Sequence, residues 1–343
     1  MVSQTDAKQA DPVYELLRVV GEARRVLVVT HTDPDPDAIG SAVGLAELLR
    51  KRLNVETTLA YSGIVGRAEN KAMVRELAIV LRPYCGIRCE DFDLVALVDS
   101  QPGAGNQPLG PDCPARIVID HHPRRQETSS AVFAEVREDY AASSTIVTRL
   151  MRAARVRPSS QAATALFYGI RTDTLGLSRP STEQDSRAYL HLLKYIDRGA
   201  LLRIENASVP PDYFRALDIA LHQTSCVDGL VVARLGNMRY PDMAAEVADF
   251  LRRLEGARVI VAVGDYAGEV VVSVRGNGEG MALDDLVQHV IGSDGTAGGH
   301  DAMAAGRVPA LLHGTPEQTV EALIARFARA LGVQHHTSVP LVP

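Results

Sequence analysis

The chain has 343 residues, of which 46% are hydrophobic and 23% are charged, and its formal net charge is −6. This length accommodates two domains or one large one, and the composition is that of an ordinary globular protein. The acidic balance speaks against a broad nucleic-acid-binding face, which usually shows a basic excess. If the chain handles phosphate, it needs a local site made of metal ions and a few arginines.

Neither the N-terminal segment nor the cysteines point to export or to a membrane. No basic region is followed by an apolar stretch at the start, and no apolar run approaches the roughly 18 residues of a membrane helix. The four cysteines are Cys85, Cys89, Cys113 and Cys226. Only Cys85 and Cys89 form a close pair, which argues against a structural zinc site. We therefore expect free thiols and a cytoplasmic location.

Apolar runs alternate with helical segments over the first 180 residues, which favours a mainly parallel sheet covered by helices. The expected elements are helices over 12–25, 38–52, 69–82, 143–155 and 160–172, and strands over 26–30, 55–61, 94–98, 116–119 and 131–136. The glycine- and proline-rich segment 101–114 is expected to be a loop.

The rest of the chain predicts a helical connection and a second, smaller domain. We expect an α/β protein with an N-terminal domain over 12–181, a helical linker over 182–225 and a mixed α/β domain over 226–332. Strand signals lie within 226–235 and 257–276, and helices are expected over 242–255, 281–291 and 315–331. The pair His335 and His336 is expected to lie in a loose, solvated tail.

Acidic residues and histidines follow several of these elements at the point where each one ends. The segment HTDPDPDAIGS at 31–41 directly follows the first strand, Asp99 ends another, and a third ends on Asp120, His121 and His122. Asp173 lies where a helical run ends. Because parallel strands place their carboxyl ends at one edge of a sheet, these side chains can converge.

A charge count supports two metal ions at this edge. Asp35, Asp37, Asp99 and Asp173 carry four negative charges, and carboxylates crowded in this way need cations to neutralise them. Two divalent ions roughly 3.5–4 Å apart suit in-line attack on phosphorus. Mixed histidine and carboxylate ligands favour Mn²⁺, with Mg²⁺, Co²⁺ or Fe²⁺ as alternatives. His122 and Arg124 could add positive or donor groups for the phosphate.

These motifs resemble those of the DHH phosphoesterase superfamily. The four motifs occur in order, as HTDPDPDAIGS at 31–41, LVDS at 97–100, IDHHP at 119–123 and YGIRTDT at 168–174. The segment GTAGGHDAMAAG at 295–306 is similar to the GGH signature of the DHHA1 domain. Within the superfamily, the chain is most similar to the bifunctional oligoribonuclease and pAp phosphatase (nanoRNase) subfamily.

The resemblance implies a role for each matching residue. It implies that one metal is held by His31, Asp35 and Asp99, and the other by Asp37, Asp99, His121 and Asp173. Asp120 would orient a neighbouring side chain, and His122 would contact the scissile phosphate and help the leaving group depart.

The resemblance also implies a phosphate-binding pocket in the second domain. Its residues would be Arg275, Gly298, Gly299, His300 and, as a weaker candidate, Asn277. The alternatives are a surface arginine at a strand end and a glycine-rich turn before a helix. Three positions depart from the common pattern: Asp33, Pro36 and Ala297.

The implied function is hydrolysis of 2- to 5-mer RNA, linear dinucleotides or 3′-phosphoadenosine 5′-phosphate (pAp), with the substrate held between the two domains. Long duplex nucleic acid and membranes are not expected partners, and the resemblance also allows a homodimer. Three enzymatic alternatives stay open, namely a cyclic dinucleotide phosphodiesterase, a RecJ-type single-strand exonuclease and an inorganic pyrophosphatase. A nucleotide-binding sensor without catalysis is the non-enzymatic alternative. The sequence leaves open the polarity of cleavage and the native metal.

Overall fold

A computed structural model describes residues 11–277, 282–300, 303–333 and 338–342. The chain divides into two compact units, residues 1–207 and residues 208–343. His335 and His336 lie outside the described residues, and His300 is described by its backbone alone.

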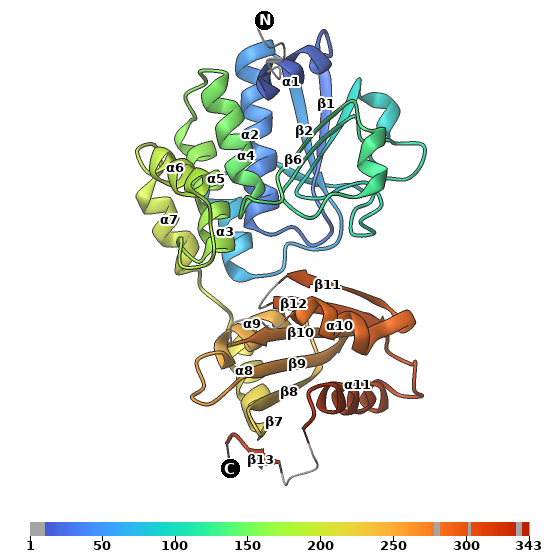
Figure 1. The fold of residues 1–343 in the computed structure, drawn as a ribbon. Helices are drawn as coiled ribbons and strands as arrows, with labels where there is room; N and C mark the ends of the chain where they lie inside the picture. The colour runs from blue at the N-terminus through green and yellow to red at the C-terminus, as the bar shows by residue number, and fades with distance from the viewer. Residues whose placement is uncertain (1–10, 278–281, 301–302, 334–337, 343) are drawn as a thin grey trace, which may run out of the picture. The chain divides into compact units, whose positions relative to one another are not determined.

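The first unit alternates strands and helices, as the sequence predicts (Figure 1). Its helices are α1 (Pro12–Val20), α2 (Pro36–Leu53), α3 (Ala68–Glu76), α4 (Ser143–Ala153), α5 (Ser160–Thr174), α6 (Glu183–Leu192) and α7 (Arg198–Glu205). Its strands are β1 (Arg25–Val29), β2 (Glu56–Tyr61), β3 (Leu81–Pro83), β4 (Leu94–Val98), β5 (Ile117–Asp120) and β6 (Phe133–Val136). The strands form one parallel sheet in the order β3-β2-β1-β4-β5-β6.

The central strands are apolar on both faces because both faces are covered. One face packs against a core shared with α1, α2, α4 and α5, and Val28, Val98 and Ile119 point into it. The alternate residues Leu27, Val29 and Leu97 belong to a second core on the opposite face. Successive side chains of a strand point to opposite faces, so this division follows directly from the strand geometry.

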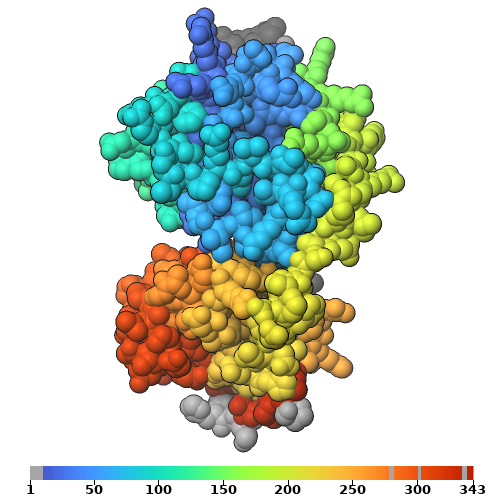
Figure 2. Space-filling view, turned by 180° about the vertical axis from the view of Figure 1, so that it is seen from behind, coloured from blue at the N-terminus to red at the C-terminus, as the bar shows by residue number. Residues whose placement is uncertain are grey.

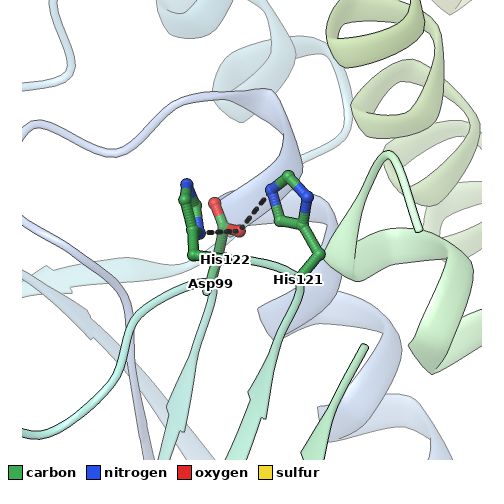
Figure 3. Close-up of side chains that lie close together, drawn as sticks. All are labelled: Asp99, His121 and His122. Carbon is green, nitrogen blue, oxygen red and sulfur yellow. Dashed lines mark ion pairs between the residues drawn. The ribbon is translucent and has the colours of Figure 1, made fainter. Parts of the chain in front are cut away.

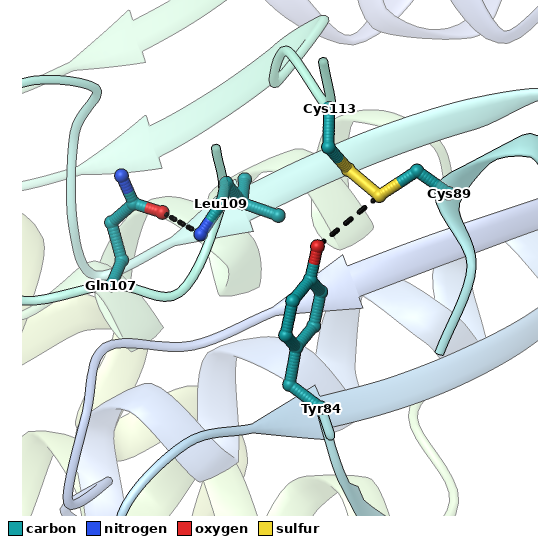
Figure 4. Close-up of a disulfide and its surroundings, with 5 residues drawn as sticks. All are labelled: Tyr84, Cys89, Gln107, Leu109 and Cys113. Atoms are coloured by element: carbon teal, nitrogen blue, oxygen red, sulfur yellow. Dashed lines mark hydrogen bonds between the residues drawn. A yellow bond between two sulfur atoms is a disulfide. The ribbon is translucent and has the colours of Figure 1, made fainter. Parts of the chain in front are cut away.

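The second core is covered by the largely irregular segments 84–93 and 99–115, which flank β4 and contain no α-helix. Cys89 and Cys113 are joined there by a disulfide, and the hydroxyl of Tyr84 lies 3.3 Å from Sγ of Cys89 (Figure 4). The prediction of free thiols is therefore wrong for this pair, although Cys85 and Cys226 are free. A sequence separation of 24 residues conceals the pairing, because the fold of the loop brings the two Cα atoms to 5.7 Å.

Helix α2 packs tightly against α4 and α5 because glycines line the contact. A Cβ at Gly40 would lie 2.6 Å from the carbonyl oxygen of Ala165. A Cβ at Gly169 would lie 2.5 Å from Oγ of Ser144 and 2.9 Å from Cα of Asp37. The missing side chains thus allow the start of α2 and the last turns of α5 to approach each other closely.

The second unit contains one mixed sheet with helices on both faces. Its helices are α8 (Pro211–His222), α9 (Met243–Leu251), α10 (Leu283–Ile291) and α11 (Pro316–Ala330). Its strands are β7 (Thr224–Val227), β8 (Leu230–Asn237), β9 (Val259–Tyr266), β10 (Glu269–Gly276), β11 (Thr296–His300), β12 (Met303–Pro309) and β13 (Val339–Pro340). The strand order is β11-β12-β10-β9-β8-β7-β13, in which only β8 and β9 pair in parallel among the described strands.

Several elements differ from the sequence-based expectation. The opening helix stops at Val20 because Gly21, at φ 54°, ends it. The helix expected over 69–82 ends at Glu76, and Leu81–Pro83 instead pairs with β2 as a short strand. The alternative of a glycine-rich turn at 295–306 is wrong, because β11 and β12 form an antiparallel pair there.

The helices expected over 182–225 divide between the two units. The buried residues Leu192 of α6 and Ile204 of α7 belong to the core of the first unit, whereas Ala220 of α8 packs in the second. In the space-filling view, the yellow-green α6–α7 region lies along one side of the first unit (Figure 2). Among the described helices, none has both the length and the apolar character that crossing a membrane requires.

The buried carboxylate of Glu47 joins α2 to the start of α5, and this contact makes stability depend on pH. Glu47 accepts hydrogen bonds from Nζ of Lys51 at 2.9 Å and from the backbone N–H of Ser159 at 2.6 Å, and also from the Ser159 hydroxyl. Burial opposes ionisation of Glu47, but the hydrogen bonds from Ser159 and Lys51 lower its pKa.

We expect Glu47→Gln to reduce the free energy of unfolding by about 1–2 kcal/mol at pH 7. A lowered pKa contributes stability that is fully present above the unfolded value of about 4.3. The difference between wild type and variant should therefore shrink as the pH falls below that value. Urea unfolding at several pH values measures it. Glu183→Gln is the control, since its exposed pair with Arg187 should contribute less than about 0.5 kcal/mol.

The close approach at Gly169 predicts that even a methyl group is disruptive there. We expect Gly169→Ala to lower the free energy of unfolding by about 1–3 kcal/mol, because the added Cβ meets Ser144 and the backbone of Asp37. Gly199→Ala is the matched control in α7, where the residue is exposed and alanine favours the helix by up to about 1 kcal/mol. Chemical denaturation compares the two, and equal stability of both variants would contradict the packing argument.

Candidate metal centre

The acidic and imidazole side chains singled out in the sequence meet at one edge of the first unit's sheet. His31 follows β1, Asp99 follows β4, and Asp120 is the last residue of β5. Asp35 and Asp37 lie at the start of α2, and Asp173 lies in the last turn of α5. These are the carboxyl ends of parallel strands and the helix ends beside them, where open α/β sheets bind ligands.

The side chains form adjoining groups, and Asp99 contacts an imidazole in each direction. Nε2 of His31 lies 3.7 Å from Oδ1 of Asp35 and 3.5 Å from Oδ2 of Asp99. Nε2 of His121 lies 3.6 Å from Oδ1 of Asp99 and 3.8 Å from Oδ2 of Asp173. Each oxygen of Asp99 therefore faces a different imidazole.

These distances fit ligand atoms that converge on an ion. The potential ligand atoms of His31, Asp35 and Asp99 all lie within 4.8 Å of one another, and the same holds for Asp37, His121 and Asp173. Asp99, His121 and His122 form a third such group, in which the Asp99 carboxylate lies between the two rings (Figure 3). The ligand sets implied by the family resemblance are brought together here, and their roles stay a prediction.

Backbone carbonyls hold the two imidazoles in the form that a metal ligand requires. Nδ1 of His31 lies 2.8 Å from the carbonyl oxygen of Thr32, and Nδ1 of His121 lies 3.2 Å from that of Tyr140. A carbonyl oxygen can only accept, so Nδ1 carries the hydrogen in each ring. In the neutral ring this leaves the lone pair of Nε2 facing the carboxylates, which is the common arrangement around metal-bound histidine.

Helix N-termini fix the orientation of Asp35 and Asp37. Oδ1 of Asp35 accepts from the backbone N–H groups of Asp37 and Ala38 at 2.9 Å and so caps α2. The two oxygens of Asp37 accept from the first N–H groups of α4, at 2.6 Å from Ser143 and 2.8 Å from Ser144. The positive ends of two helix dipoles therefore support these carboxylates.

The remaining negative charge exceeds what the protein neutralises. Burial raises the pKa of Asp37 and Asp173 well above the usual aspartate range, and the neighbouring carboxylates add to this effect. Asp173 also lies at the C-terminal end of α5, where the helix dipole disfavours a negative charge. A site of this kind binds protons or cations, and its carboxylate and imidazole donors suit divalent metals.

His122 differs from the other two histidines because its partner is a buried carboxylate. Its Nδ1 donates to Oδ1 of Asp120 at 2.9 Å, and its side chain is 46% exposed. Burial opposes the charged form of His122, but the hydrogen bond to Asp120 and the charge of Asp99 raise its pKa to about 9. The ring can therefore present an N–H to a ligand from the side away from Asp120.

The predicted substrate-binding residues Arg124, Arg275 and Asn277 differ in burial and in their hydrogen-bond partners. Arg124 is exposed, two residues after His122. Arg275 is buried in β10, where Nε donates to Asp249 at 2.6 Å and Nη1 to Ser273 at 2.8 Å. The side-chain amide of Asn277 donates to the carbonyl oxygens of Arg252 and Ala257, at 2.7 and 3.2 Å, which holds the end of a loop.

The two glycines of the GGH segment differ in what they allow. A Cβ at Gly299 would lie 2.4 Å from the carbonyl oxygen of Met303, so the pairing of β11 with β12 requires a glycine there. A Cβ at Gly298 would meet no atom within 4 Å, so this position is open. The strand pairing therefore explains the glycine at 299, whereas Gly298 stays available for contact with a ligand.

Sequence reasoning missed the polar residues that hold the cluster in place. The hydroxyl of Ser143 donates to Oδ1 of Asp99 at 2.9 Å, and the amide of Gln101 donates to Oδ2 of Asp120 at 2.6 Å. Asp33, which the sequence singles out as a departure from the family pattern, holds the first loop by accepting from the N–H of Ile64 at 2.8 Å. For Ser143, the one signal in the sequence is its place beside a second serine at the start of a predicted helix, which resembles an ordinary helix cap.

Comparison with known proteins agrees with this architecture. Residues 25–170 match the DHH family, N-terminal domain, and residues 228–332 match the DHHA1 domain. A crystal structure of an exopolyphosphatase-related protein from Bacteroides fragilis has the same fold, with a TM-score of 0.74 at 15% sequence identity. The alignment covers 95% of this chain and 98% of that one.

Three relatives show the range of proteins to which the sequence is similar. An uncharacterized protein of Methanocaldococcus jannaschii is 32% identical over 83% of this chain and 58% of its own length. The cyclic-di-AMP phosphodiesterase GdpP of Geobacillus thermodenitrificans is 28% identical over 91% of this chain and 49% of its own. The bifunctional oligoribonuclease and PAP phosphatase NrnA of Thermus thermophilus is 27% identical over 95% of this chain and 99% of its own.

The chain thus spans about half the length of the first two relatives and nearly the whole length of the third. Its two structural units correspond to the two matched domains, and the motif residues lie together at the sheet edge of the first. The chain therefore belongs to the DHH family, with a DHH N-terminal domain followed by a DHHA1 domain.

Proposed function

We propose that this protein is a metal-dependent phosphoesterase that hydrolyses short nucleotides to mononucleotides. The observation that carries the proposal is the arrangement around Asp99, whose two oxygens face His31 and His121 in two adjoining groups of potential ligands. A single carboxylate placed in this way can bridge two cations, and paired cations are the arrangement that phosphoester hydrolysis uses.

The residues divide between holding cations and handling the phosphate. His31, Asp35 and Asp99 would hold one divalent ion, and Asp37, Asp99, His121 and Asp173 the other, with Mn²⁺ as the preferred metal. Bound cations of this kind supply positive charge for the phosphoryl oxygens and lower the pKa of water. His122, oriented by Asp120, donates a hydrogen bond to the scissile phosphate or a proton to the leaving oxygen.

The net charge of the chain and a relative of similar length both favour short substrates. The net charge of −6 provides no basic face along which a long nucleic acid could bind. The Thermus relative, an oligoribonuclease and PAP phosphatase, aligns over almost its whole length. Dinucleotides, RNA of up to about five nucleotides and pAp are therefore the proposed substrates, and Arg275 of the DHHA1 domain is proposed to bind one of their phosphates.

A cyclic dinucleotide phosphodiesterase is the second candidate. The alignment with the Geobacillus cyclic-di-AMP phosphodiesterase spans 91% of this chain and so includes both domains. The linear product of opening a cyclic dinucleotide is itself a dinucleotide of the kind proposed above. The two candidates therefore differ in whether the closed ring is accepted.

A substrate panel with Mn²⁺ tests the proposal directly. We expect turnover of 2-mer RNA, linear diadenylate and pAp to mononucleotide products, with a 24-mer cleaved at least tenfold more slowly, measured by chromatography of the products. The Asp120→Ala/His121→Ala double variant should be inactive, because it loses a proposed metal ligand and the partner of His122. Asp285→Asn, at an exposed position of α10, is the control and should retain wild-type turnover.

Each contrary result points to a defined alternative. Equal cleavage of the 24-mer would reject the preference for short substrates, and preference for cyclic diadenylate would favour the second candidate. Pyrophosphate as the best substrate would identify a pyrophosphatase. Binding of nucleotides without any turnover would identify a sensor.

Metal binding is also expected to stabilise the fold independently of any activity. At a free Mn²⁺ concentration of 100 times Kd, binding to the native state contributes about 2.7 kcal/mol, which corresponds to a rise in Tm of about 5–10 °C. Thermal unfolding with and without Mn²⁺ measures this rise. Asp99→Asn should lose most of it because both ion sites share that carboxylate, whereas Asp285→Asn should retain it. An unchanged rise in Asp99→Asn would contradict the proposed ligand set.

A further inference from the structure

Gln101 is a fully buried amide that lies beneath the DHH triplet. It is 1% exposed and follows Asp99 by two residues, at the start of the loop that covers the second face of the sheet. Its Nε2 lies 2.6 Å from Oδ2 of Asp120 and 3.1 Å from the carbonyl oxygen of Pro123. Its Oε1 lies 2.9 Å from the backbone nitrogen of Arg125 and 2.7 Å from Oγ1 of Thr128.

These partners determine which end of the amide donates. The backbone N–H of Arg125 can only donate, so Oε1 must face it. The carbonyl oxygens of Pro123 and His122 can only accept, so Nε2 must face them. The amide therefore has one orientation, and in that orientation it donates to Oδ2 of Asp120.

The hydrogen bonds of Gln101 extend through Asp120 to His122. With Oδ2 accepting from Gln101, the other oxygen of Asp120 accepts from Nδ1 of His122 at 2.9 Å. The remaining nitrogen of His122 points away from Asp99 (Figure 3), and the side chain is 46% exposed. The series from the N–H of Arg125 through Gln101 and Asp120 thus holds Nδ1 of His122 against Asp120 and sets the direction of the ring.

We propose that Gln101 is a positioning residue, which orients the Asp120 carboxylate so that His122 presents its Nε2–H to the leaving oxygen. In the part of the chain that the structure describes, Gln101 is the one side chain that donates to Oδ2 of Asp120. Without it, this buried oxygen loses its partner, and the carboxylate is free to turn toward other donors. The inference rests on the proposed hydrolase function for its effect on rate.

The proposed step is balanced in protons and electrons. The oxygen of a water molecule bonds to phosphorus and releases one proton to solvent. As the bond between phosphorus and the leaving sugar oxygen breaks, its electron pair moves to that oxygen, which takes the proton from Nε2 of His122. The ring becomes neutral while Asp120 stays ionised, and solvent later returns the proton. A leaving group that is already stable as an anion needs no such proton, so the loss caused by a misplaced His122 depends on the leaving group.

Leaving-group dependence gives the test. Gln101→Met removes the donor while keeping the side-chain volume, and Gln107→Met is the matched control. Among the described residues, the Gln107 side-chain carbonyl accepts from the backbone N–H of Leu109 in its own loop, at 2.6 Å, and from no other group (Figure 4). With Mn²⁺ bound, kcat is measured on linear diadenylate, whose leaving group is a sugar hydroxyl, and on thymidine 5′-p-nitrophenyl phosphate, whose leaving group is a stable phenolate.

We expect Gln101→Met to lower kcat for linear diadenylate about 100-fold, with KM changed less than threefold. On the p-nitrophenyl ester, kcat should fall less than about fivefold, and Gln107→Met should match wild type on both substrates. Equal losses of Gln101→Met on both substrates would indicate general disruption and overturn the proposal. No loss on either substrate would also overturn it. Thr128→Val, which removes one donor to Gln101, should show the same pattern with a smaller loss.

A readout without turnover separates this inference from the proposed function. Nitrogen NMR of ¹⁵N-histidine-labelled protein with diamagnetic Mg²⁺, recorded at a pH at which the His122 ring is neutral, reports its tautomer, which should be Nδ1–H in wild type and a mixture in Gln101→Met. If wild type hydrolyses neither ester, the proposed function fails while the spectrum still tests the positioning role. An unchanged His122 signal in a folded Gln101→Met protein would overturn that role.

Discussion

The structure depends on a balance of charge at one edge of a parallel sheet, where four carboxylates are held beside two imidazoles. The protein supplies part of the compensation through the N-termini of α2 and α4, whose N–H groups face Asp35 and Asp37. Asp173 receives the opposite influence, because it lies at the carboxyl end of α5. The negative charge left after these contributions is what divalent cations neutralise, so the order of strands and helices produces the site's affinity for metal.

The tight helix packing and the irregular covering loop serve the same site from opposite faces of the sheet. On one face, Gly40 and Gly169 allow α2 and α5 to meet, which brings Asp37 beside Asp173. On the other face, the Cys89–Cys113 disulfide holds the segment that contains Gln101. Two layers that contact opposite faces of β4 and β5 thus position the side chains of the site, and the sheet between these layers is their rigid support.

The sequence predicts elements whose signal is local and misses those whose signal depends on tertiary contact. The apolar runs at β1, β4 and β5 indicate buried strands. The acidic motif after β1 indicates a metal site, because carboxylates crowd there with no lysine or arginine among them. β11 is missed because its sequence TAGGH lacks apolar alternation and contains two adjacent glycines, which are depleted in strands. Its strand conformation comes from pairing with β12, which no local pattern reports.

Buried polar residues illustrate the same limit at the level of side chains. Gln101 lies in a segment rich in glycine and proline, where a glutamine ordinarily indicates a solvated loop. Its function follows from partners 19 to 27 residues away in the chain, namely Asp120, Arg125 and Thr128. No repeating pattern in the sequence links these positions. The disulfide is hidden for the same reason, since its two cysteines become neighbours only when the loop closes over the sheet.

The polar side chains of the DHHA1 domain and those at the sheet edge of the DHH domain differ in how far the protein itself satisfies them. The amide of the exposed Asn277 donates to backbone carbonyls, and the buried Arg275 donates to Asp249, Ser273 and a carbonyl, so protein groups hold both side chains. The cluster around Asp99 is the reverse case: its carboxylates repel one another, and burial and that repulsion raise the pKa of Asp37 and Asp173. A fold does not gather such charges for its own stability. Uncompensated charge therefore marks the sheet edge of the DHH domain as the functional site, and the DHHA1 domain is proposed to contribute Arg275 as a ligand for a substrate phosphate.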